Sequence, residues 1–217
     1  MIDRLINWID ERYQLREFVK PYLDKPVSPH EMSFKFCWGG ITFLLIIVQV
    51  ITGVFLAYYY RPNVAEAYQS IRFITDEVYL GWLVRGIHHH SSSLLVITVF
   101  VHMLIVFFRG AYKNPRELNW VSGALLFFLV MAFAFSGYLL IWDQLGYWAT
   151  RVGTGIAGEV PLVGEYILLF IQGGYGVKQP TLSRFYATHI LVLPAILGLI
   201  LALHFAMVRR RGISEPL

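Results

Sequence analysis

Four histidines in two apolar segments are the residues of this sequence best suited to bind a metal. His88 and His102 lie 14 residues apart, and His189 and His204 lie 15 apart. In an α-helix these spacings fall about 40° short of four full turns and about 60° past them, so each pair shares one helix face, with about 21–22 Å of rise between its members. Two such helices side by side would form two facing couples of histidines, one near each edge of a bilayer. This pattern indicates two stacked bis-histidine hemes.

The composition is that of a membrane protein. Of the 217 residues, 57% are hydrophobic and 15% are charged, and the mean hydropathy is +0.56, which favours several membrane spans over a soluble domain. The net charge of +4 comes from short basic segments beside apolar runs, so we expect no nucleic-acid partner. The single cysteine excludes an internal disulfide, and the charged, amphipathic N-terminus is not typical of a cleavable signal peptide.

The apolar runs predict an all-α fold, a polytopic four-helix bundle that forms a single membrane domain over residues 1–217. The expected spans are 36–60, 81–108, 120–142 and 182–208. Residues 1–30 should form an N-terminal surface helix and a proline-marked linker, although a soluble extension bound to a partner would also fit. Residues 61–80 are read as a polar, partly helical loop. Residues 143–180 should hold short helices along one membrane face.

Basic residues near the spans set the orientation. The 109–117 turn and the C-terminal arginines fall on one side if there are four spans, and that side should be the negative (cytoplasmic or stromal) side. The second and fourth spans then both begin on the positive side. Topology alone therefore pairs His88 with His189 near the positive side, and His102 with His204 near the negative side.

Heme explains these couples better than the alternatives do. One histidine within a span could simply bond between helices, but four at matched heights argue against that reading. Another metal would be poorly completed, because the spans offer no further cysteine or carboxylate at either level. A porphyrin supplies four equatorial ligands, and two axial histidines saturate the iron, which favours electron transfer over oxygen binding.

Small residues in the other two spans repeat the spacing of the first histidine pair. Gly39 and Gly53 lie 14 residues apart, as do Gly123 and Gly137. We expect them to let heme faces or edges approach the backbone, with ordinary glycine-mediated helix packing as the alternative.

Charged and polar residues at the membrane edges are further candidates. Arg85 is predicted to bind a heme propionate on the positive side. The corresponding candidates on the negative side are Arg116, Lys113 and Arg209, for which a purely topology-setting charge is an equal alternative. His89 and His90 are read as interfacial or propionate-contacting residues, and His30 as a surface residue. A lone cysteine such as Cys37 is usually a small buried hydrophobe.

Several stretches resemble one family closely. They are CWGGITF, QVITGVFLAYYYRP, GWLVR, KNPRELNWVSG, SGYLLIWDQLGYW, TLSRFYATH and RRRGISEPL. With them, nearly the whole chain resembles the short cytochrome b family, which includes cytochrome b6 of cytochrome b6f complexes and the cytochrome b of bacterial menaquinol:cytochrome c reductases. The 15-residue spacing in the last span is also that of this short branch.

The resemblance implies two heme b groups, one on His88 and His189 and one on His102 and His204. It also implies a covalent heme c on Cys37, through the CxGG motif, and a proton-translocating Q cycle with a quinol substrate. The implied partners are a three-helix subunit IV-like protein, a Rieske iron–sulfur protein and a cytochrome c/f-type subunit, in a dimeric complex. The location would be a bacterial cytoplasmic or thylakoid membrane. The segment after Trp142 would help to line the quinol site.

Departures from the plant-type pattern leave some details open. Ile141 stands where plant-type chains have proline, and His89 and His90 stand where those chains have Arg-Trp. Bacillus-type chains of this family also have His at the first of these two positions, which favours a bacterial menaquinol user. Two other function classes remain at this point. A diheme anchor of a dehydrogenase or hydrogenase would share the spans and histidine pairs but not the NPRELNW or WDQLGYW segments, and a non-redox membrane protein would show no heme spectrum.

Overall fold

The computed structural model describes residues 2–14, 16–17, 20 and 37–212. Its contacts divide the chain into two compact units, Met1–Cys37 and Trp38–Leu217. The first unit contains helix α1 (Ile2–Tyr13). We expect one surface helix over residues 1–22, but the backbone leaves the helix at Gln14 with a φ of 49°, and the described residues 16, 17 and 20 are helical again. The predicted linker, with His30, and the tail 213–217 lie outside the described residues. The single-domain reading of 1–217 stays a prediction.

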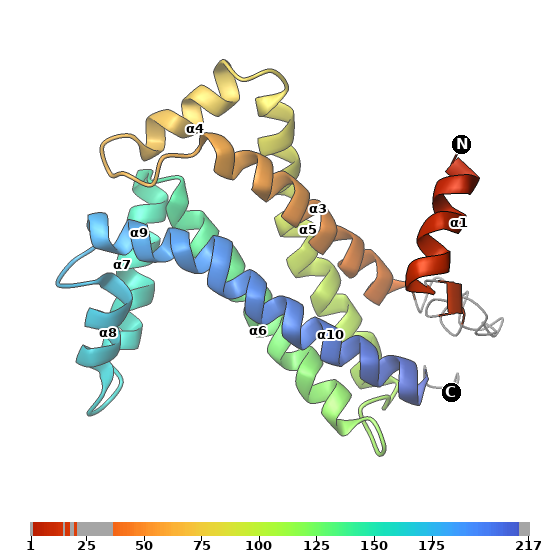
Figure 1. The fold of residues 1–217 in the computed structure, drawn as a ribbon. Coiled ribbons are helices and arrows are strands. Elements are labelled where there is room, and N and C mark those ends of the chain that lie inside the picture. Colours follow the sequence, from red (N-terminus) through yellow and green to blue (C-terminus); the bar gives the residue numbers. More distant parts are fainter. Residues whose placement is uncertain (1, 15, 18–19, 21–36, 213–217) are drawn as a thin grey trace. The chain divides into compact units, whose positions relative to one another are not determined.

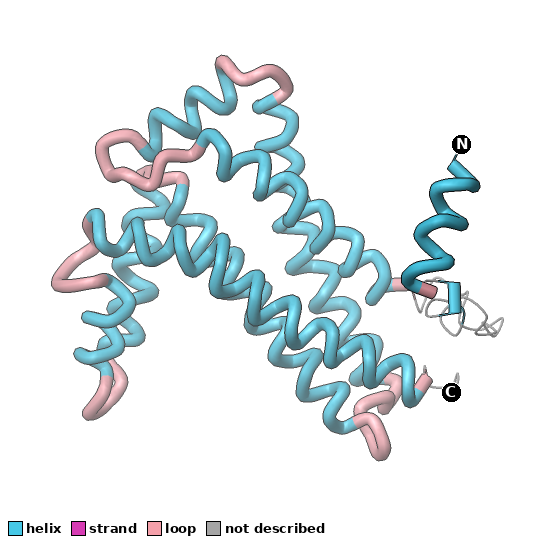
Figure 2. Tube along the Cα trace, in the orientation of Figure 1, coloured by secondary structure: helices cyan, strands magenta, loops and turns pink. Residues whose placement is uncertain are grey.

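In the described part of the second unit, helices are joined by loops and turns and no strand occurs (Figure 2). Within the described residues, four helices are long and apolar enough to cross a membrane. They are α3 (Trp38–Tyr59), α5 (Gly81–Phe108), α6 (Glu117–Leu140) and the continuous helix Gln179–Arg211, which comprises α9 (Gln179–Ala187), the π-helical η3 (Thr188–Val192) and α10 (Leu193–Arg211). The predicted all-α fold with four spans is therefore confirmed.

The span boundaries differ from the prediction at three of the four helices. The first span runs from Trp38 to Tyr59 rather than from 36 to 60. The third span runs from Glu117 to Leu140 rather than from 120 to 142. It starts early because Glu117 suits the positive end of the helix dipole, and it stops early because the chain turns at Trp142, whose φ is 55°. The fourth span extends three residues beyond 182–208 at each end, since Pro180 lies at a first-turn position that tolerates proline.

The spans pack mainly in two pairs. Helix α3 runs along α5, and α6 runs along α10, while α5 also contacts α6 (Figure 1). A core of Leu95, Val99 and Val130 fills the space between α5 and α6, with Leu45 and Ile46 of α3 packed against it. Many large apolar side chains of the spans remain exposed, as expected for surfaces that face lipid.

Shorter helices pack against the spans, α4 (Ala67–Asp76) against α3 and α5, α7 (Gln144–Gly158) against α6, and α8 (Gly164–Gln172) against α9. Helix α4 precedes α5, and α7 and α8 follow α6. Asp143 caps α7 by accepting a 2.7 Å hydrogen bond from the Gly146 N–H. Gln172 ties α8 to α7 through a 2.6 Å bond to Thr154. The two helices predicted between the third and fourth spans are both present.

Candidate functional site

The four histidines lie in the two helices that topology predicts to begin on the same membrane side. His88 and His102 lie in α5, His189 lies in η3 and His204 lies in α10. His189 interacts electrostatically with His88, and His204 with His102. The imidazoles are thus grouped in two couples at different heights, with the same partners that the topology assigns.

A π-helical turn accounts for the longer spacing of the second pair. In η3 the N–H of Leu193 bonds to the carbonyl of Thr188, five residues earlier, whereas an α-helical bond reaches back four. One turn therefore takes up one extra residue. Fifteen residues with one such turn keep nearly the same phase as fourteen residues of regular α-helix. His189 and His204 consequently share a face as closely as His88 and His102 do.

Each of the four predicted glycines lies against one of the four histidine rings. A Cβ atom added to Gly39 would lie 3.2 Å from Cε1 of His102, and one added to Gly53 would lie 3.3 Å from Cε1 of His88. The corresponding distances are 3.4 Å between Gly123 and His204 and 2.8 Å between Gly137 and His189. The glycines were expected to make room for heme faces or edges. In this structure the room that they leave is taken by the imidazoles.

Hydroxyl groups hold three of these rings by Nδ1. Thr52 Oγ1 lies 2.8 Å from Nδ1 of His88, Ser136 Oγ lies 2.9 Å from Nδ1 of His189, and Ser122 Oγ lies 2.9 Å from Nδ1 of His204. All three hydroxyl-bearing residues are buried, and each comes directly before one of the glycines. Sequence reasoning missed these residues. The recurring Ser/Thr-Gly dipeptide, in phase with the glycine spacing, was the available signal.

The direction of these bonds follows from the protons of the hydroxyls. Each hydroxyl donates to a backbone carbonyl of its own helix, at 2.6 Å from Val48 for Thr52, 2.8 Å from Asn119 for Ser122 and 3.2 Å from Phe133 for Ser136. The oxygens are therefore left to accept, so the network assigns the proton of each imidazole to Nδ1. Nε2 then carries a lone pair suited to bind a metal.

Gln49 adds a second support for His88 that the sequence did not reveal. Its side-chain Nε2 donates to the backbone carbonyl of His88 at 2.8 Å and to Ser91 Oγ at 2.6 Å. Because Gln49 belongs to α3, it fastens the two helices together at the level of the ring. A polar residue within an apolar span thus has its hydrogen bonds satisfied.

The donor set at each level fits a heme. Among the described residues, no group of three or more His, Cys, Asp or Glu side chains could hold a bare metal ion, so each couple offers two imidazoles. A porphyrin needs two axial ligands, and the hydroxyl-bound Nδ1 atoms leave Nε2 available in three of the four rings. The chemistry of the residues present therefore suits the group that the sequence implies.

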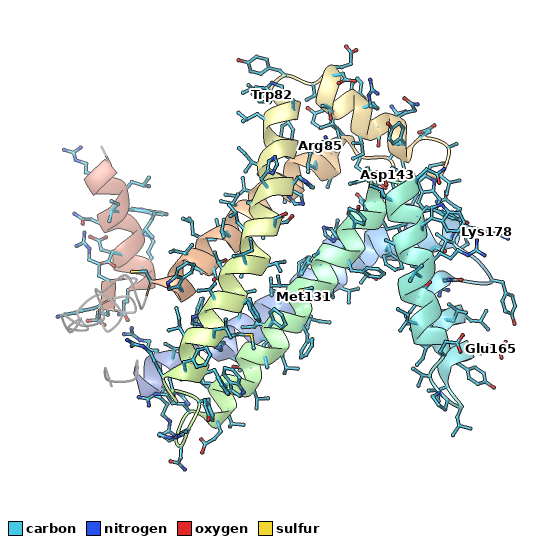
Figure 3. All side chains as sticks on the ribbon, turned by 180° about the vertical axis from the view of Figure 1, so that it is seen from behind. Trp82, Arg85, Met131, Asp143, Glu165 and Lys178 are labelled. Atoms are coloured by element: carbon cyan, nitrogen blue, oxygen red, sulfur yellow. The ribbon has the colours of Figure 1, made fainter. Side chains whose placement is uncertain are left out.

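The predicted propionate ligands lie toward the ends of the spans. Arg85 is half-buried on α5, one turn before His88 (Figure 3). Arg116 donates through Nη2 to the carbonyl of Arg211 at 3.4 Å. Its Nε, and Oδ1 of the neighbouring Asn119, are buried without a hydrogen-bond partner within the described residues. Such orphaned polar groups indicate space for a polar ligand. Arg209 is half-buried and Lys113 is exposed.

The remaining candidates lie at the surface of the described structure. His89 and His90 are exposed, with their ring centroids 5.1 Å apart in an edge-to-face arrangement. Cys37 is exposed and comes directly before the first residue of α3.

An apolar groove lies where α6 approaches α7. It has a volume of about 570 Å³ and is lined by Tyr138, Gln144, Leu145, Trp148, Ala149, Val152 and Gly153. Nearly all of this lining belongs to the segment after Trp142. The groove is therefore available to an apolar ring compound or to the apolar face of a neighbouring protein.

Comparisons with known proteins agree with the family resemblance of the sequence. The family model described as cytochrome b/b6/petB matches residues 22–212. The chain is similar to cytochrome b6 of Heliomicrobium gestii, with 45% identity over 98% of this chain and 100% of the relative. It is also similar to cytochrome b6 of Gloeobacter violaceus, with 43% identity over 100% of both chains.

A solved structure described as a hyperthermophilic respiratory complex III matches the fold. Its TM-score is 0.88 at 36% identity, and the match covers 97% of this chain and 56% of that one. The chain thus spans little more than half the length of its counterpart in that structure.

Proposed function

Because this chain belongs to the cytochrome b/b6 family, we propose that its four histidines hold two heme b groups that carry electrons across the membrane in a Q cycle. At the coarser level, the chain is a multi-pass membrane protein of electron transport and a cytochrome b subunit of a quinol-oxidising, multisubunit complex. The family also implies heme b as its cofactor. The heme-binding residues, the Q cycle and the identities of the partner subunits are what we propose.

The bonds of the histidine rings carry this proposal. His88 and His189 form the couple for one heme, and His102 and His204 form the couple for the other. The hydroxyls of Thr52, Ser136 and Ser122 hold three rings by Nδ1, so Nε2 is presented as an axial ligand. When bound, a heme with two histidine ligands supplies reversible one-electron transfer without an open position for oxygen.

The proposed cycle begins at the positive side. Quinol is oxidised there with release of two protons. One electron passes to a Rieske iron–sulfur protein and then to a cytochrome c/f-type subunit, and the other crosses to reduce quinone at the negative side. A three-helix partner would complete the quinol site, since the comparison chain is longer than this one. The groove of α6 and α7, lined by Tyr138, Trp148 and Val152, would contribute apolar contacts that exclude water from the quinol ring.

Cys37 is proposed to bind the third heme, a heme c, through one thioether bond. The support is the Cys37-Trp38-Gly39-Gly40 motif and the exposure of Cys37. Heme staining that survives denaturing electrophoresis and is lost in Cys37→Ala would support this attachment. Absence of stain in the native chain would remove the third heme.

Spectra of the purified complex test the heme assignment. His189→Ala and His204→Ala should each remove about half of the b-type reduced-minus-oxidised absorption, since each substitution deprives one heme of an axial ligand. His90→Ala is the matched control and should keep both hemes. Retention of both b hemes in His189→Ala would contradict the assignment of the histidine ligands. Purification of the native complex without a Rieske protein would instead favour a membrane anchor of a dehydrogenase.

A further inference from the structure

We propose that the hydroxyls behind the histidine rings are positioning residues that make the two b hemes unequal electron acceptors. Among the described residues, the positive-side couple has two of these hydroxyls and the negative-side couple has one, so an electron is driven from the positive side toward the negative side. This inference rests on the proposed function, in which the histidine couples bind heme b. It adds a physical reason for the direction of electron transfer.

The asymmetry lies in the residues that precede the four glycines. Thr52 and Ser136 precede Gly53 and Gly137, and their hydroxyls bond to His88 and His189 of one couple. In the other couple, Ser122 precedes Gly123 and bonds to His204. The residue before Gly39, whose Cα lies against His102, is Trp38. An indole donates through Nε1 but has no oxygen to accept from an imidazole, so the corresponding hydroxyl bond cannot form there.

Backbone bonds do not remove this difference. His189 also bonds to the backbone of Phe133, and His204 to the backbone of Asn119. One ring at each level therefore has such a bond, on the same helix as its hydroxyl. The side-chain hydroxyls are what distinguish the two levels.

A hydrogen-bond acceptor at Nδ1–H changes the reduction potential of the iron, because it changes the basicity of the imidazole ligand. It draws the proton of the ring outward and makes Nε2 a more basic donor. A more basic ligand stabilises ferric over ferrous iron and lowers the reduction potential, since bonds in this outer shell are one of the levers that tune a heme. Two such bonds should lower the potential of the positive-side heme more than one lowers that of the negative-side heme. One electron then passes from the positive-side heme, which is oxidised, to the negative-side heme of higher potential, which is reduced. No proton moves in this step.

Redox titration of the b hemes in the purified complex tests this inference, because each variant predicts the sign of a change. Thr52→Val and Ser136→Ala should each raise the lower midpoint potential and bring the two midpoints closer together. Ser122→Ala should raise the higher midpoint and move them further apart. Thr52→Ser and Ser136→Thr retain the hydroxyl and should restore the native separation.

Matched controls separate this effect from a general loss of structure. Thr75 donates to the carbonyl of Ile71 at 2.8 Å within α4, much as Thr52 donates within α3, so Thr75→Val should leave both midpoints unchanged. If Thr52→Val lost its heme, Ser136→Ala and Ser122→Ala would still change the separation between the two midpoint potentials in opposite directions. Unchanged midpoints, or equal changes of both midpoints in every variant, would overturn the inference. Absence of b hemes from the native complex would instead overturn the proposed function.

Discussion

Gly137 of α6 lies so close to His189 that a Cβ atom added to it would come within 2.8 Å of the imidazole Cε1. This is the tightest of the four glycine–histidine contacts. Because the ring is held by Ser136, the residue next to this glycine, it cannot move away without losing its hydrogen bond.

Gly137→Ala should therefore destabilise the protein by about 1–3 kcal/mol, the usual cost of overpacking, and lower its heme content. The check is thermal unfolding together with the reduced-minus-oxidised spectrum. Gly198→Ala, at a glycine of α10 with open space around its Cα, is the control and should be neutral. Gly123→Ala, with 3.4 Å to its ring, should be milder, and an equal loss in all three variants would contradict the steric argument.

The π-helical turn predicts an unequal response to a change in chain length. Deletion of Leu191, an exposed residue of η3, should convert the π turn into regular α-helix. His189 and His204 would then lie 14 residues apart on one face, and both b hemes should be retained. Insertion of an alanine after Leu191 should rotate His189 by about 100° and remove one heme. Heme content of the two variants decides the question, and loss in both would show that η3 has no such role.

Gln49 should stabilise the contact between α3 and α5. Gln49→Leu leaves the apolar packing but removes the donor to the His88 carbonyl and to Ser91, which we expect to cost about 1–3 kcal/mol of stability. The measurement is the unfolding midpoint in detergent. Gln69→Leu, at an exposed position of α4, is the control. An equal shift of the unfolding midpoint in Gln69→Leu would contradict a specific role for the hydrogen bonds of Gln49.

Tyr60 should make the fold sensitive to alkali. Burial, with the Tyr186 phenol beside it, raises the pKa of Tyr60 well above its ordinary value, and the two ring centroids lie 5.4 Å apart. A raised folded-state pKa contributes stability below the unfolded pKa of about 10, and this contribution is lost as the pH rises further. Tyr60→Phe should therefore reduce the loss of stability above about pH 10. Thermal unfolding across pH 9–12 is the check, with the exposed Tyr58 as control. An unchanged alkaline slope would contradict this role.

Much of the fold could be predicted because its signals are local. A run of apolar residues long enough to cross a bilayer is visible without knowledge of its neighbours, and the second span was predicted at its observed bounds, Gly81–Phe108. The end of α6 was harder to place, because it depends on the turn at Trp142 and the Asp143 cap of the next helix. Both lie within a segment whose apolar character continues past the helix end.

The sequence by itself determined the four spans, the histidine and glycine spacings and the topological pairing of the histidines, because a helix repeats every 3.6 residues whatever surrounds it. Only the tertiary structure decided which side chain holds which ring. Thr52 and His88 are 36 residues apart in sequence, and Ser122 and His204 are 82 apart, so their bonds exist only once the helices have packed. The π turn behind the 15-residue spacing likewise depends on backbone hydrogen bonding, which residue types alone do not specify.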